Sequence, residues 1–222
     1  MGTNDWYGTH LPIADLRKWY GHNQIIQIDI NIKMAYKTIR LKRGKDESLL
    51  RFHPWVFSGA IATLPDNLEE GDLVRVESHE GETIGVGHYQ IGSIAIRILE
   101  FGVETLSQNY FEKRLNAAYE MRRNLALIRP DNDCFRLVHG EGDFLPGLVI
   151  DIYGKTAVVQ AHSPGMHFCR QQIADALLSI PDAGIANIYY KSETTLPFKA
   201  QLDPVNDYIV GGFDTNIATE NG

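Results

Sequence analysis

The most informative stretch of this sequence is residues 42–61, which read KRGKDESLLRFHPWVFSGAI. Basic residues, a short run able to form a helical turn, and aromatic residues on both sides of a proline share these positions. A folding module needs some of them, and a nucleic-acid-binding surface could use others. Assigning each residue to one of the two requirements is the main question that the sequence poses.

Composition allows one large or two small globular domains, because the chain has 222 residues and 44% of them are hydrophobic. No apolar run approaches the roughly 18 residues of a membrane-spanning helix, so no membrane partner is expected. The net charge of −7 by itself argues against nucleic-acid binding. Residues 34–53, however, hold six Lys and Arg against two acidic residues. A local basic patch of this kind can hold a phosphate backbone.

Cysteine and histidine usage argues against a metal centre. Cys134 and Cys169 lie 35 residues apart without a CxxC motif, which is typical of a reducing cytoplasm and predicts a cytoplasmic location. The histidines show no HxxxH or HExxH spacing, so no metal site is predicted. The glycine-rich stretches 85–92 and 140–147 lack the strand–GxGxxG–helix context, and turn glycines explain both.

Three acidic residues are candidates for acid–base or metal chemistry, namely Glu141, Asp143 and Asp151. Two of them, two positions apart, could divide acid and base roles. They lie in a turn rich in Gly and Pro, where Asp normally caps backbone groups. We therefore favour a structural role for them.

The first module is predicted to be a small, partly closed β-barrel. Residues 36–41 alternate as a strand, and Pro54 should end a helical turn over 46–52. Gly81 is expected to have a positive φ in the turn of a hairpin. Short strands at this spacing favour a barrel. The further strands are expected over 72–78, 83–89 and 94–100.

A long helix and a second module should follow. Ser107 can cap a helix that runs to about Ile128, with Phe111, Leu115, Ala118, Arg122 and Leu125 on one side. The second module is then α+β, with one face of a sheet covered by a helix over 165–178 and an irregular connection from Lys191 to Asp207. Its strands are expected over 135–139, 148–152, 157–161, 185–190 and 208–210.

Both ends of the chain differ from its body. Residues 1–33 lack strand patterns until position 25, and we expect Met34 to be the natural start; a true N-terminal arm is the alternative. The chain closes on Asn221-Gly222, a strong signal for a type I′ hairpin turn without its returning strand. We therefore expect the chain to be part of a longer protein.

The stretch 42–61 has two candidate uses. Leu49, Leu50, Pro54, Trp55 and Phe57 are expected to build the barrel, although His53, Trp55 and Phe57 could instead stack on unpaired bases. The charged residues have no use in a core and can neutralise phosphates. The predicted RNA-binding residues are Lys42, Arg43, Lys45, Arg51 and His53.

Two motifs carry a family resemblance. RFHPWVFSGAI at 51–61, followed by Gly71-Asp-Leu-Val and Gly85-Val-Gly, resembles the N-terminal PUA domain of the SAM-dependent 23S rRNA cytosine-5 methyltransferases. FRLVHGEGDFLPGLVIDIYG at 135–154 is similar to the signature of their second, EEHEE domain. The resemblance runs from about Met34 to Gly222. It implies a PUA-like RNA-binding domain over 34–104, a connecting helix over 105–130 and an EEHEE-like domain over 131–222.

The resemblance also implies a role. In that family a Rossmann-like third domain holds S-adenosyl-L-methionine and the catalytic cysteine, and it is expected to lie outside this chain. Neither Cys134 nor Cys169 matches the catalytic motif, so no catalytic or cofactor-binding residue is assigned. The chain is then expected to dock rRNA for that domain and to be inactive alone. The alternative is a free-standing PUA-type RNA-binding adaptor, and the reading frame beyond Gly222 would discriminate the two.

Overall fold

The computed structural model describes residues 36–197, 200, 202, 204–212 and 216–222. The prediction about residues 1–33, including Met34 as the natural start, lies outside these. Residues Lys37–Gly222 form one compact unit. No helix in the described part is long and apolar enough to cross a membrane.

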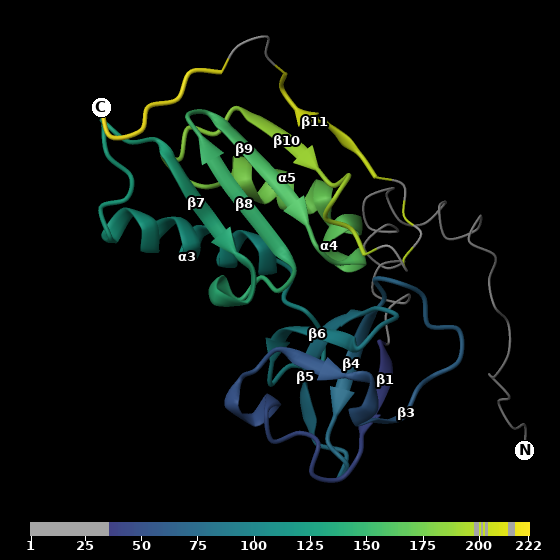
Figure 1. Ribbon diagram of the computed structural model, residues 1–222. Helices are drawn as coiled ribbons and strands as arrows, with labels where there is room; N and C mark the ends of the chain where they lie inside the picture. The colour runs from purple at the N-terminus through teal and green to yellow at the C-terminus, as the bar shows by residue number, and fades with distance from the viewer. Residues whose placement is uncertain (1–35, 198–199, 201, 203, 213–215) are drawn as a thin grey trace, which may run out of the picture. The chain divides into compact units, whose positions relative to one another are not determined.

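The first part of the unit is a curled, six-stranded sheet (Figure 1). Two short 3-10 helices interrupt it, η1 at Leu49–Arg51 and η2 at Ser58–Ala60. The strands are β1 Lys37–Leu41, β2 Trp55–Phe57, β3 Ile61–Thr63, β4 Leu73–Glu77, β5 Thr83–Tyr89 and β6 Ile94–Phe101. Their order is β2-β6-β5-β4-β1-β3. All neighbours are antiparallel except β1 and β4, which pair in parallel.

Alternating residues build the core of this sheet. Side chains on neighbouring strand positions point to opposite faces, so every second residue can enter the core. Fully buried alternating pairs come from β1, β4 and β6: Ile39 and Leu41, Val74 and Val76, Ile96 and Ile98. The predicted β4–β5 hairpin is confirmed, and Gly81 in its turn has φ +91°.

The predicted core role of residues 49–57 is only partly correct. Leu49 is buried, whereas Leu50 is 67% exposed, because the single turn of η1 presents one side to the core. In β2 the alternation buries Val56 and leaves Phe57 50% exposed, so the expectation that Leu50 and Phe57 build the barrel is wrong. Pro54 and Trp55 are half-buried.

The long helix α3 spans Tyr110–Asn124, which is shorter at both ends than predicted. Ser107 is not its cap: the N-cap position is Asn109, and the Ser107 backbone N–H and hydroxyl donate to Glu100 at 2.9 and 2.8 Å. The predicted buried side is confirmed at four positions and wrong at Leu125, which is 64% exposed. The four buried residues are Phe111, Leu115, Ala118 and Arg122.

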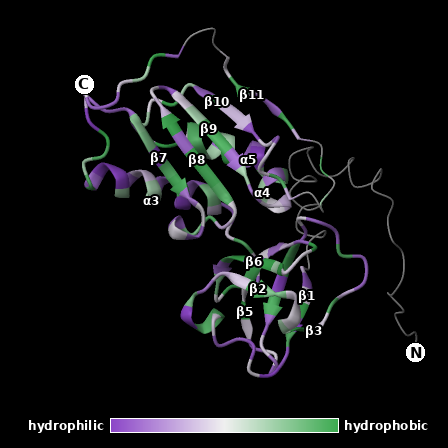
Figure 2. Cartoon of the chain, viewed as in Figure 1, coloured by the Kyte–Doolittle hydropathy of each residue, from purple (hydrophilic) through white to green (hydrophobic). Residues whose placement is uncertain are grey.

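The second part of the unit is a five-stranded sheet with helices on one face. Figure 2 shows hydrophobic residues along β7 and β8, and hydrophilic residues over much of α3. The strands are β7 Cys134–His139, β8 Leu148–Tyr153, β9 Thr156–Ala161, β10 Asn187–Lys191 and β11 Asn206–Val210. The helices are η3 Gly140–Asp143, α4 Pro164–Phe168 and α5 Arg170–Leu178. Sheet order is β11-β10-β9-β8-β7, and α4 and α5 form the crossover between the parallel strands β9 and β10.

The two sheets share a close-packed contact within this unit. A Cβ atom on Gly165 of α4 would lie 2.1 Å from Cγ of His88 in β5, so only glycine fits there. His88 is itself buried, and its Nε2 lies 3.8 Å from Sγ of Cys169. Leu99 of β6 belongs to the hydrophobic core of the second sheet. The sequence-based boundaries at 104/105 and 130/131 stay predictions.

Candidate nucleic-acid interface

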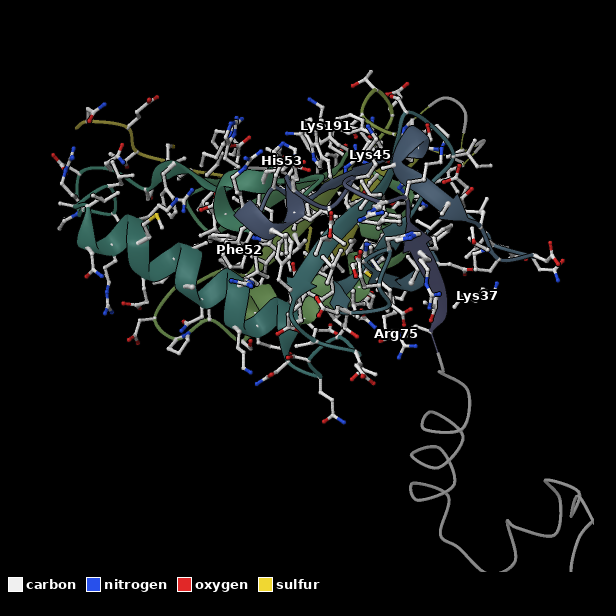
Figure 3. The ribbon with its side chains drawn as sticks, turned by 90° about the horizontal axis from the view of Figure 1, so that it is seen from below. Lys37, Lys45, Phe52, His53, Arg75 and Lys191 are labelled. Atoms are coloured by element: carbon white, nitrogen blue, oxygen red, sulfur yellow. The ribbon has the colours of Figure 1, made fainter. Side chains whose placement is uncertain are left out.

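The loop from Lys42 to Pro54, which we call the basic loop, joins β1 to β2 and carries all the predicted RNA-binding residues. Gly44 turns the chain with φ +67°, and the Lys45 backbone N–H donates to the Lys42 carbonyl at 3.1 Å. Phe52 then ends η1 in the left-handed conformation with φ 62°. Each of the predicted residues is exposed: Lys42, Arg43, Lys45, Arg51 and His53. Figure 3 shows Lys45, Phe52 and His53 on this loop.

Neighbouring cations on the strands are neutralised. Lys37 pairs with Asp72 at 3.0 Å, and Arg40 pairs with Glu77 at 3.1 Å. Arg75 also pairs with Glu77 at 3.1 Å. Figure 3 labels Lys37 and Arg75 on these strands. Paired charges of this kind contribute little to the field that an anionic ligand meets.

The cations of the basic loop are not neutralised in this way. Within the described part of the chain, no ion pair forms at Lys42, Arg43, Lys45 or Arg51. The Lys42 ammonium donates to the Gly59 carbonyl, a neutral acceptor, at 2.9 Å. These four cations can therefore approach phosphates without first breaking an internal pair.

The His53 ring is held by a hydrogen bond from the backbone two residues further along the chain. Its Nδ1 accepts the Trp55 backbone N–H at 3.3 Å, so the neutral ring carries its proton on Nε2. The ring also meets Trp55 edge-on, with centroids 5.2 Å apart. His53 thus presents a donor nitrogen beside the four cations.

A chain of edge-on aromatic contacts continues from His53 into β2. Trp55 meets Phe57 at 6.3 Å between centroids, and its indole N–H donates to Oε1 of Glu141 at 2.8 Å. Phe52 is 65% exposed and meets Phe101 edge-on at 5.4 Å. The exposure of Phe57 beside the unpaired cations fits the alternative in which this residue stacks on unpaired bases. The exposed Phe52 was not anticipated from the sequence, where the crowding of aromatics around His53-Pro54 was its only signal.

A hollow of about 460 Å³ opens beside the basic loop. The loop forms one wall of the hollow, and the chain around η2 forms the other. The lining residues are Gly44, Lys45, Glu47, Ser48, Arg51, Phe57, Gly59 and Ala60. Spacing in the sequence could not reveal this hollow, because its two walls come from separate segments.

The three acidic candidates all have structural partners. Asp143 forms a buried ion pair with Arg122 and accepts the His139 backbone N–H at 2.6 Å. Asp151 accepts two hydrogen bonds from Arg136, at 2.8 and 3.1 Å. Glu141 accepts from Trp55. Among the described residues, no three His, Cys, Asp or Glu side chains gather as metal ligands would. The predicted structural role of these carboxylates agrees with this geometry.

The two cysteines are free and half-buried. Burial raises the pKa of the Cys169 thiol to about 11. Burial and the nearby Asp133 carboxylate also raise the pKa of Cys134. A thiol with a raised pKa forms less thiolate, which is the nucleophilic form of cysteine.

One family model and several known methyltransferases are similar to this chain. A family model described as a PUA-like domain matches residues 39–101. The ribosomal RNA large subunit methyltransferase I of Klebsiella pneumoniae is 35% identical over 77% of this chain and 42% of its own length. The enzyme of the same name from Alteromonas mediterranea is 36% identical over 82% of the chain and 46% of its own length. The chain resembles the rRNA large subunit methyltransferases.

The resemblance to these methyltransferases has a limited extent. The chain spans less than half the length of the curated relatives that it matches. Among solved structures, a protein from Streptococcus mutans with a provisional assignment as a SAM-dependent methyltransferase has a TM-score of 0.65 and 18% identity, covering 81% of this chain and 44% of its own. A second such methyltransferase, complexed with SAH, has a TM-score of 0.64 and 19% identity. These two structures show a shared fold.

Proposed function

We propose that this chain is the RNA-recognition and linking portion of a SAM-dependent rRNA (cytosine-5) methyltransferase, with rRNA, specifically 23S, as its partner. The PUA-like barrel docks rRNA through the basic loop. The five-stranded module orients the barrel toward a catalytic domain that lies outside this chain. The observation that carries the proposal is a set of four exposed cations on a PUA-like domain, none of which has an acidic partner among the residues that the structure describes.

The charge arrangement supports RNA rather than a small anion. Four cations along one loop can meet several phosphates of a backbone in succession, and each contact releases counterions. The overall charge of −7 does not oppose this, because an exposed field falls off within about 10 Å at ordinary salt. The acidic residues elsewhere then limit non-specific binding.

In this role the chain itself catalyses no reaction. An enzyme that modifies a base must take it out of its stack, and a docking module that holds the surrounding RNA supports this step. S-adenosyl-L-methionine belongs to the catalytic domain of the full-length protein, and a cytoplasmic location is part of the proposal. Calorimetry should detect no saturable SAM binding to this chain. A saturable isotherm would contradict the assignment of SAM to the catalytic domain.

The test of docking is charge reversal at Lys42, Arg43 and Lys45. We expect this triple variant to bind an rRNA fragment at least tenfold more weakly, because each reversed residue replaces attraction by repulsion. The matched control reverses Lys113, Lys155 and Lys191, which are also exposed and change the net charge by the same amount. Equal loss in the two variants would show a general charge effect, and an unchanged affinity of the first would remove the basic loop from the interface.

A further inference from the structure

We propose that the hollow beside the basic loop binds a single unpaired nucleotide of the RNA, with its base against Phe57 and its phosphate between Lys45 and Arg51. The inference rests on the proposed function and goes further, because it assigns the recognised feature: a flipped-out or bulged nucleotide rather than a regular duplex. The volume of about 460 Å³ lies within the range of small-ligand sites.

The apolar wall of the hollow suits a base. Phe57 is 50% exposed although it belongs to a strand, and it contributes to the lining with Ala60. Its ring meets Trp55 edge-on, at 89° between the planes, and this contact limits its motion. Trp55 is fixed in turn by its hydrogen bond to Glu141. An exposed ring that is already held in place loses little freedom when a base stacks on it.

The polar groups around the hollow suit a nucleotide better than a free anion. Lys45 and Arg51 line it and have no ion pair among the described residues. Glu47 lines it too, and a carboxylate repels a bare phosphate but accepts from the amino groups of a base. The Ser48 hydroxyl makes no capping hydrogen bond in η1 and is open to a ligand. Donors, one acceptor and an aromatic face together match base plus phosphate.

Regular duplex RNA cannot use such a site. Paired bases are stacked within the helix, and an A-form duplex offers proteins its backbone and shallow groove. A base must leave the stack to reach Phe57. The hollow therefore predicts a preference for RNA that carries an unpaired nucleotide, whereas the basic loop alone would bind both forms through phosphates.

The test uses two variants of the full chain. Phe57→Ala removes the stacking face. Gly59→Leu fills the hollow, since a Cβ on Gly59 meets nothing within 4 Å and φ is not positive there. Leu64→Ala is the matched control, because Leu64 is 49% exposed on the same barrel and lies outside the hollow. The probes are one RNA hairpin with a single bulged nucleotide and the same hairpin without it.

The wild-type chain should bind the bulged hairpin about tenfold more tightly than the regular one. Phe57→Ala and Gly59→Leu should each abolish this difference and leave the affinity for the regular hairpin unchanged, and Leu64→Ala should preserve it. If the wild-type chain shows no preference, or if both variants retain one, the inference is overturned. Circular dichroism identifies a variant that fails to fold, and the other variant then decides.

The two hairpins distinguish a failure of the nucleotide site from a failure of RNA docking. Reversal of Lys42, Arg43 and Lys45 should weaken binding of both hairpins, whereas the Phe57 and Gly59 variants act on the bulged hairpin alone. Binding that depends on the cations without any preference for the bulge would leave the docking role intact and overturn the nucleotide site.

Discussion

The indole N–H of Trp55 donates to the carboxylate of Glu141 across 2.8 Å, joining β2 of the six-stranded sheet to η3, which follows β7 of the five-stranded sheet. The two residues are 86 positions apart. Trp55 follows the basic loop directly and also supports Phe57. This hydrogen bond therefore connects the end of the basic loop to η3, which lies between β7 and β8 of the five-stranded sheet.

The first prediction concerns the energy of that contact. Trp55→Phe and Glu141→Ala should show a coupling of about 1–2 kcal/mol in the free energy of unfolding. Each substitution alone removes the hydrogen bond to the carboxylate, so the double variant cannot lose it a second time. Urea titration of the two single variants and the double variant measures it. Pairing Trp55→Phe with Glu112→Ala, an exposed carboxylate on α3, should give additive effects. Additivity in the Trp55–Glu141 cycle would show that the bond contributes nothing.

The second prediction concerns the close approach of Gly165 to His88. Gly165→Ala should lower the free energy of unfolding by about 1–3 kcal/mol, because the added methyl group overlaps the imidazole ring and the packing must shift. Gly142→Ala is the control, since nothing lies within 4 Å of its Cβ position. Thermal denaturation of both variants gives the comparison. Equal melting temperatures would mean that the contact relaxes without cost.

The third prediction concerns pH. Burial, aided by the positive charge of Arg97, lowers the pKa of His88 to about 4 in the folded chain. The unfolded chain has the ordinary value near 6.5, so it binds the proton first as pH falls. Stability should therefore be fully present above pH 6.5 and decline toward pH 4, by roughly 3 kcal/mol from this group.

The measurement for His88 is a comparison of variants. His88→Gln should show a smaller loss of unfolding free energy than the wild-type chain between pH 6.5 and 4. His79→Gln, at an exposed turn position, should follow the wild-type curve. Burial lowers the pKa of His162 and His167 as well, and these groups titrate alike in all three proteins. Parallel curves for all three would exclude His88 as the source.

The fourth prediction concerns salt. The logarithm of the RNA association constant should fall linearly with the logarithm of salt concentration, by about 0.7–0.9 per phosphate contact. Lys42→Glu combined with Lys45→Glu should flatten this slope by about 1.5, while Lys113→Glu with Lys155→Glu leaves it unchanged. Fluorescence anisotropy from 50 to 200 mM salt provides the data. A slope that is the same in both double variants would contradict direct phosphate contact at Lys42 and Lys45.

Most of the fold could be predicted because alternation is a local property. The β4–β5 hairpin and the strand β6 follow from residues that lie next to one another in the chain. Errors arose where a residue's environment depends on distant segments. Phe57 is a large apolar residue of the type found in cores. The antiparallel pairing of β2 with β6, however, turns Val56 inward and leaves Phe57 exposed.

In the candidate site, too, local features could be predicted from the sequence, and features that depend on strand pairing could not. Unpaired charge could be anticipated at Lys42 and Lys45, because charged side chains have no place in a core. The neutralisation of Arg40 by Glu77 could not, since the parallel pairing of β1 with β4 brings these residues together. The hollow also depends on two segments whose proximity no spacing rule predicts.

The basic loop contributes very little to the barrel that carries it. From Lys42 to Pro54, Leu49 is the one side chain that is fully buried. Substitutions at the exposed charged positions Lys42, Arg43 and Lys45 leave the core intact, so they cost little in stability. If the loop binds RNA as proposed, its RNA preference can consequently change during evolution through a single surface loop, while the same strands are retained.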